Sequence, residues 1–221
     1  FTRWFIPESI LTLLIALALY LFLTGLEDRQ PARIYCTYVL LALAMLAKGL
    51  IAPVFFLGAL SIYLWITGEH RRWREFRLLT GTLLFLLIAA PWHILAGLHN
   101  PDQGHPVGNI PSPGNVHGFF YFYFINEHLL RFLGKRYPRD YNRLPGYLFW
   151  SLHLVWLFPW SLYWPATLYA SWRKRCAPGE GWGWKRRLHL DFTGKTTLLL
   201  TLYSAFILLF FSLSTNQEYY T

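Results

Sequence analysis

Charged residues are scarce in this chain of 221 residues. They make up 14% of the sequence, whereas a typical soluble domain carries about 25%. Hydrophobic residues make up 55% and aromatic residues 19%. This composition excludes an ordinary water-soluble globule and favours a membrane protein with several hydrophobic segments.

Cysteine is scarce as well. Cys36 and Cys176 lie in unrelated segments and form no disulfide or metal-binding pattern. The net charge is +9, but most basic residues cluster between hydrophobic stretches. We therefore interpret the basic residues as topology signals and as contacts to lipid headgroups, and we expect no nucleic-acid partner.

Six uncharged stretches can be read from the sequence, and five of them are long enough, or nearly so, to cross a bilayer as helices. They are residues 9–26, 34–47, 49–68, 78–98, 144–172 and 196–214. Inside a bilayer only a helix satisfies its own backbone hydrogen bonds over such lengths. The sequence therefore predicts an all-α polytopic membrane protein with about six transmembrane helices.

The basic clusters predict the orientation of these helices. They follow the first, third and fifth stretches, and the last of them lies in the loop of residues 173–195. The positive-inside rule places all three clusters in the cytoplasm. The loop of residues 99–143 and the turn at Lys48 then belong to the opposite, outer side.

Lys48 follows the shortest stretch. Residues 34–47 number 14, which gives roughly 21 Å of helix against about 30 Å of hydrocarbon. Lys48 is therefore expected below the outer membrane surface, where a charge needs a polar cavity and an anionic partner. Alternatively, the lysine extends along its own aliphatic stem to reach the interface.

The outer loop contains an aromatic run with charged residues. Residues 119–133 (FFYFYFINEHLLRFL) carry Glu127, His128 and Arg131 and predict a helix that lies in the membrane interface. More basic residues follow: Lys135, Arg136, Arg139 and Arg143. This cluster fits either attraction to anionic headgroups or a rim that binds phosphate.

Glu8 opens the first helix on the same predicted side as Lys48, His128 and the polar residues 214–218. One interpretation is a favourable acid at a helix N-terminus. The other is a carboxylate of a polar site, paired with His128 around a divalent metal ion. Two ligands alone do not define a metal site.

Five segments, in order, resemble one family. They are residues 43–53 (LAMLAKGLIAP), 90–92 (APW), 124–132 (FINEHLLRF), 157–165 (LFPWSLYWP) and 210–220 (FFSLSTNQEYY). The family is the bacterial glycosyltransferases with the GT-C membrane fold, close to the dolichyl-phosphate-mannose–protein mannosyltransferases and the lipid A aminoarabinose transferases. The resemblance runs from about Pro7 to Thr221, essentially the whole chain.

The resemblance implies an enzyme of the bacterial inner membrane. Such an enzyme moves a sugar from a polyisoprenyl phosphate carrier to a protein, lipid A or another glycan acceptor at the periplasmic face. Lys48 is then expected near the carrier phosphate, with Glu127 and Arg131 as further substrate-binding residues. Glu8 and His128 would contribute to a polar or metal site, and Glu8 is a distant candidate for the catalytic base.

The resemblance also implies that the chain is a fragment. The family's first helix and its catalytic carboxylate would precede Phe1, and later helices would follow Thr221, so we expect the fragment alone to be inactive. The chain departs from the family at Glu8, where Asp is usual, and at residues 216–218, where Lys is common.

Two other functions stay open on the sequence. A lipid-linked sugar transporter or flippase would also place basic residues in a membrane cavity, although the internal repeats that would favour it are not visible. An O-antigen ligase would use the same carriers, but with different outer-loop segments.

Overall fold

The computed structural model describes residues 7–102, 117–137, 146–163, 165–166, 169 and 190–213. The long helices are α1 (Pro7–Glu27), α2 (Pro31–Lys48), α3 (Ile51–Thr67), α4 (Leu78–His99) and α8 (Phe192–Leu213). The short ones are η1 (Glu69–Arg72), η2 (Tyr121–Leu130), α6 (Gly146–Trp156) and η3 (Trp160–Leu162). These residues form no strand. The predicted all-α class is therefore confirmed for this part of the chain.

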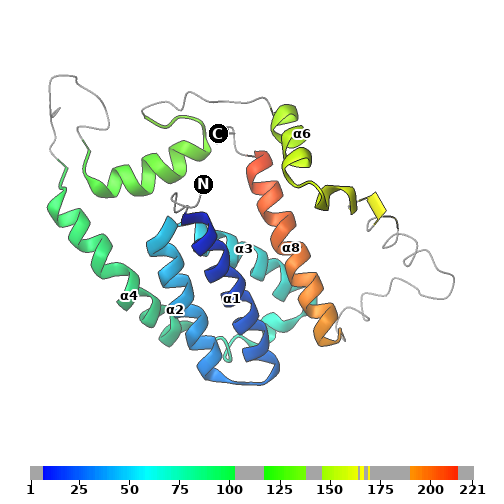
Figure 1. Cartoon of the computed structure of the whole chain (residues 1–221). Helices are drawn as coiled ribbons and strands as arrows, with labels where there is room; N and C mark the ends of the chain where they lie inside the picture. The colour runs from blue at the N-terminus through cyan, green and yellow to red at the C-terminus, as the bar shows by residue number, and fades with distance from the viewer. Residues whose placement is uncertain are drawn as a thin grey trace.

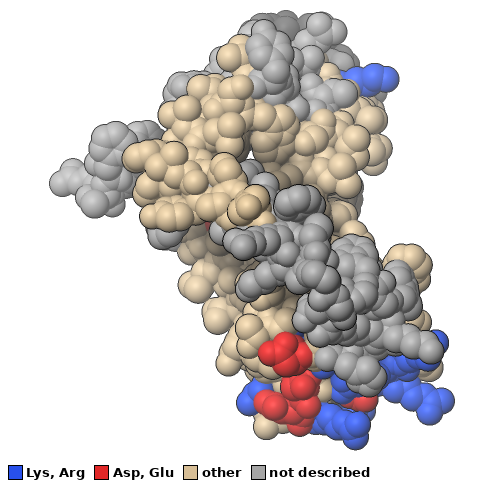
Figure 2. Space-filling view, turned by 90° about the vertical axis from the view of Figure 1, so that its right-hand side faces the viewer, with Lys and Arg blue, Asp and Glu red and all other residues tan. Residues whose placement is uncertain are grey.

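Four of the described helices are long and apolar enough to cross a membrane, namely α1 from Glu8, α2, α4 and α8. Helix α3 is also apolar but has only 17 residues. Figure 2 shows that most Lys, Arg, Asp and Glu side chains on one face gather at one end, below a broad uncharged surface. The polytopic membrane character predicted from the composition is confirmed.

Helices α1, α2 and α3 form the centre of the bundle. Helix α2 packs against α1 and α4, while α3 packs against α8 (Figure 1). Their shared core buries Phe22 of α1, Ile34 of α2, Phe56 and Tyr63 of α3, and Leu199 of α8. Each of these side chains is at most 4% exposed.

Three contacts within the bundle place an aromatic ring on the backbone of a neighbouring helix. A Cβ atom at the glycine of each pair would lie 2.1 to 2.3 Å from a ring carbon. The pairs are Gly58 with Phe206, Gly81 with Tyr38, and Gly97 with Phe120. Small residues at such crossings let helices approach closely, as is typical of membrane bundles.

Helix α2 is longer than the sequence predicted. It begins at Pro31 and has 18 residues, which correspond to roughly 27 Å instead of 21 Å. Proline is favoured at the first helical position because its missing N–H would have no helical partner there. The expectation that a short helix recesses Lys48 was therefore wrong about the helix length, although Lys48 does end the helix.

The predicted stretch of residues 144–172 also differs from the structure. Helix α6 ends at Trp156, and the chain turns before the short helix η3. Pro159 lies in this turn, where it has no N–H to continue the helical hydrogen bonds. Most of the predicted loop of residues 173–195 lies outside the described residues, as do residues 103–116 and 138–145 of the predicted loop 99–143.

One end of the bundle is fastened by charged residues; we call it the Arg72 end. Arg72 donates hydrogen bonds to Glu69 at 3.1 Å, to Glu75 at 2.6 Å and to the Leu26 carbonyl at 2.6 Å. Lys195 of α8 pairs with Glu27 of α1 at 2.7 Å and with Glu69 at 3.1 Å. These contacts connect α1, η1 and α8.

The Arg72–Glu75 contact makes the stability dependent on pH. The hydrogen bond from Arg72 lowers the pKa of the Glu75 carboxyl from its ordinary value of 4.5. Because the folded-state pKa is the lower one, the stabilisation is complete above the ordinary pKa and is lost as the pH falls through the lowered pKa. We therefore expect Arg72→Gln to reduce the drop in melting temperature on acidification from about pH 6 to pH 3.

The melting temperature in detergent, measured across this pH range, tests the expectation. Arg74→Gln is the matched control, because Arg74 is an exposed arginine two residues further on that does not hydrogen-bond Glu75. The control should keep the wild-type pH dependence. An Arg72→Gln variant with the wild-type acid response would contradict the prediction.

Candidate functional site

Lys48 and Glu8 meet at the end of the bundle opposite Arg72. Lys48 is the last residue of α2, and its amine forms an ion pair with the Glu8 carboxylate in the first turn of α1. The side chains are 36% and 49% exposed, so solvent reaches both. The lysine therefore has the anionic partner that a charge near the membrane needs.

The turn between α2 and α3 brings His128 against Gly49, the residue that follows Lys48. Gly49 adopts φ 99° and ψ −161°, a conformation that few residues other than glycine adopt. A Cβ atom there would lie 2.8 Å from His128 Nε2 and 2.9 Å from the Tyr123 hydroxyl. The side chains of His128 and Tyr123 on η2 therefore contact the backbone of Gly49 directly. Lys48 is the residue before Gly49.

The hydrogen bonds of His128 fix its tautomer. The Leu50 N–H donates to Nε2 at 3.1 Å, so Nε2 must carry a lone pair. Nδ1 then carries the proton and donates to the Tyr123 carbonyl. Leu50 is the N-cap residue of α3 and has no side-chain cap of its own, so His128 satisfies a donor at the start of that helix.

The contacts of His128 and Glu8 can be compared with what the metal site expected from the sequence would need. Both ring nitrogens of His128 are engaged by the backbone, and Glu8 is engaged by Lys48. Within the described ranges, no three His, Cys, Asp or Glu side chains group as metal ligands would. Glu8 and His128 as arranged do not fit a metal ion, and the metal site stays a prediction from the sequence.

Glu127 of η2 binds two arginines, Arg131 and Arg136, that follow this helix in the chain. Its carboxylate accepts a hydrogen bond from Arg136 Nε at 2.8 Å and one from Arg131 Nη1 at 3.4 Å. The Glu127 side chain is only 19% exposed. Since a carboxylate repels an anionic ligand, this geometry gives Glu127 a positioning role toward the two guanidinium groups.

Asn126 holds the same region in place through hydrogen bonds, and the sequence analysis did not predict this role. The side chain is 3% exposed. Its amide donates to the Tyr137 carbonyl at 2.6 Å and accepts from the Tyr137 N–H at 2.9 Å. This pair holds the segment with Arg136 against η2. A polar amide within an aromatic run was the available signal.

Aromatic contacts fasten η2 across this end of the bundle (Figure 1). Tyr123 lies against the His93 ring of α4, with centroids 5.1 Å apart, and burial raises the pKa of its hydroxyl. Phe132 lies 4.8 Å from Phe210 of α8. Arg139 and Arg143 of the basic cluster and the polar residues 214–218 lie outside the described residues.

Two comparisons with known proteins found a match to this chain. Residues 1–95 match the family model described as dolichyl-phosphate-mannose-protein mannosyltransferase. The chain also superposes on the crystal structure of ArnT from Cupriavidus metallidurans bound to undecaprenyl phosphate, with a TM-score of 0.62 and 20% sequence identity. The chain has a GT-C fold. The fold that the resemblance of the five sequence segments implied is confirmed.

The GT-C match covers 95% of this chain and 32% of ArnT. The chain therefore spans about a third of the length of that protein. No curated protein matches the chain.

Proposed function

We propose that this chain forms part of a membrane glycosyltransferase that takes its sugar from a polyisoprenyl phosphate carrier. The observation that carries the proposal is the Lys48 end, where a lysine amine, its acidic partner and the two arginines that follow η2 lie at one end of a GT-C bundle. The bound carrier in the ArnT structure supports the choice of donor.

The cations suit the chemistry of the departing group. In the transfer, the bond between the anomeric carbon and the carrier phosphate breaks, a bond to the acceptor oxygen forms, and the acceptor proton passes to a base. Negative charge grows on the phosphate as it leaves, and fixed cations stabilise that charge. We assign this role to Lys48 and Arg131, with Glu127 holding Arg131 in place.

Glu8 is assigned a positioning role toward Lys48. A carboxylate held by an amine is a weak base, because the ion pair favours its charged form. We therefore place the catalytic base elsewhere in the full-length protein.

The proposal also specifies the side of the membrane that the Lys48 end faces. The Arg72 end carries the arginines that the positive-inside rule assigns to the cytoplasm. Lys48 then faces the periplasm of the bacterial inner membrane, and the acceptor is a protein, lipid A or another glycan on that side.

Carrier binding to the full-length protein tests the proposal. Lys48→Gln removes the charge but keeps much of the side-chain length. We expect carrier affinity to fall about tenfold, which equals about 1.4 kcal/mol, and the transfer rate to fall with it. Lys48→Arg should retain part of both, since it keeps the positive charge.

Arg74→Gln provides the control, because it removes one exposed charge at the opposite end. It should bind carrier like the wild type. If Lys48→Gln and Arg131→Gln both keep wild-type carrier affinity and turnover, the assignment is wrong.

A further inference from the structure

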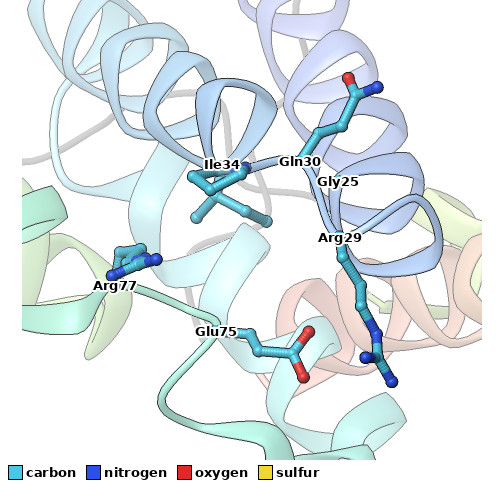
Figure 3. A pocket seen from close by; sticks show the side chains of 7 residues that line it. Gly25, Arg29, Gln30, Ile34, Glu75 and Arg77 are labelled. Carbon is cyan, nitrogen blue, oxygen red and sulfur yellow. The ribbon is translucent and has the colours of Figure 1, made fainter.

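A cavity of about 280 Å³ lies at the Arg72 end of the bundle, on the far side from Lys48. It is open to the outside, and its volume is below the roughly 300–1,000 Å³ of pockets that enclose a drug-sized ligand. It is lined by Gly25, Arg29, Gln30, Pro31, Ile34, Glu75 and Arg77 (Figure 3). The residues come from the last turns of α1, the turn that follows it, the start of α2 and the segment that precedes α4.

Two guanidinium groups border this cavity. Figure 3 shows Arg29 and Arg77 on opposite sides of Glu75. Neither guanidinium group makes a hydrogen bond or an ion pair with another described residue, whereas those of the nearby Arg33 and Arg72 are both paired with carboxylates. Planar guanidinium groups with free donors match the oxygens of a phosphate.

The carboxylate in the cavity wall does not oppose an anion strongly. Glu75 accepts two hydrogen bonds from Arg72, at 3.1 Å from Nε and at 2.6 Å from Nη2. Asp28, the other acid of the α1–α2 turn, is paired with Arg33. These pairs largely neutralise the two carboxylates, so Arg29 and Arg77 determine the sign of the local charge.

The backbone adds to this positive potential. Helix α2 begins at Pro31, after Gln30, and α4 begins at Leu78, after Arg77. Neither of the two N-cap side chains makes a capping hydrogen bond. Helix N-termini carry a partial positive charge and favour nearby anions.

The surface beside the cavity is apolar. Leu78 is 51% exposed and Leu79 is 86% exposed, and both belong to the membrane-spanning helix that starts next to Arg77. A phosphate in the cavity would therefore sit where the hydrocarbon layer meets water. This location suits the headgroup of a lipid whose chains lie along α4.

We propose that this cavity binds the phosphate group of an anionic phospholipid through Arg29 and Arg77. This site lies at the opposite end of the bundle from Lys48, so it stands or falls independently of the proposed glycosyltransferase function. The same chemistry would accept free phosphate from solution, and the experiment separates the two sources.

The test uses the full-length protein in nanodiscs of phosphatidylcholine, with or without phosphatidylglycerol. Native mass spectrometry measures how much phosphatidylglycerol stays bound, and the melting temperature reports the stabilisation that binding produces. We expect the double variant R29Q/R77Q to bind phosphatidylglycerol about tenfold more weakly, since each basic residue near such a headgroup contributes to the attraction. The single variants should each lose part of the affinity and test the site if the double variant does not fold.

R71Q/R74Q is the matched control, because it removes the same charge from exposed positions at the same end that do not line the cavity. This control should bind phosphatidylglycerol like the wild type. Equal losses in both double variants, or wild-type binding by R29Q/R77Q, would overturn the proposal.

A second arm of the experiment adds inorganic phosphate to the protein in lipid-free detergent. Stabilisation that phosphate alone produces, and that R29Q/R77Q abolishes, would support a phosphate site but overturn its assignment to a lipid.

Discussion

Gly49→Ala is expected to destabilise the protein by about 2–4 kcal/mol and to weaken carrier binding at the same time. Two effects add at this position. The φ of 99° is unfavourable for alanine, and the new methyl group would approach both His128 Nε2 and the Tyr123 hydroxyl to less than 3.0 Å. Relief of these contacts would push η2 away from the turn and displace Lys48. Thermal unfolding in detergent and carrier titration of the full-length protein measure the two consequences.

Gly68→Ala separates local strain from damage to the site. Gly68 follows the other end of α3 and also has a left-handed backbone, with φ 75° and ψ 3°. Alanine there should cost about 1–2 kcal/mol without changing carrier affinity. If Gly49→Ala retains wild-type stability and wild-type carrier binding, the contact between the turn and η2 has no importance for the site.

Lys195→Met is expected to destabilise the protein by about 2–3 kcal/mol, because it leaves the charges of Glu27 and Glu69 without this partner. The Lys195 side chain is only 15% exposed, and that of Glu69 is 13% exposed. Glu27 is 42% exposed, so water takes over part of its lost interaction. Helix α8 should loosen at its start, and limited proteolysis together with the melting temperature would report this change.

An exposed ion pair at the same end gives the comparison. Arg33 pairs with Asp28, and their side chains are 34% and 47% exposed. Arg33→Met should therefore cost less than about 1 kcal/mol, as exposed pairs usually do. Equal costs for Arg33→Met and Lys195→Met would show that burial of the Lys195 network contributes nothing.

The sequence predicted which helix ends lie together at the Lys48 end, because the ends of successive membrane helices alternate between the two membrane faces. Glu8, Lys48 and His128 were expected on one side, and the structure brings Lys48 to Glu8 and its neighbour Gly49 to His128. The length argument for Lys48 failed, since it excluded residues 31–33 from α2. Polar residues at a helix start are easily lost from a count of apolar ones.

The individual partners could not be predicted. His128 accepts its hydrogen bond from Leu50, 78 residues away, and the donor is a backbone group with no sequence signature. Lys195 meets Glu27 across 168 residues. Glu127 was predicted to bind substrate beside Arg131, and its hydrogen bond from Arg136 could not be foreseen. Such pairings depend on how the helices pack, which hydrophobic periodicity alone does not determine.

The contacts between glycines and rings at the helix crossings restrict how the bundle can deform. At Gly58, Gly81 and Gly97 the ring of a neighbouring element lies directly on bare backbone, so contact between ring and backbone sets how closely the two elements approach. Any side chain added at one of these glycines would overlap the ring and force the two elements apart.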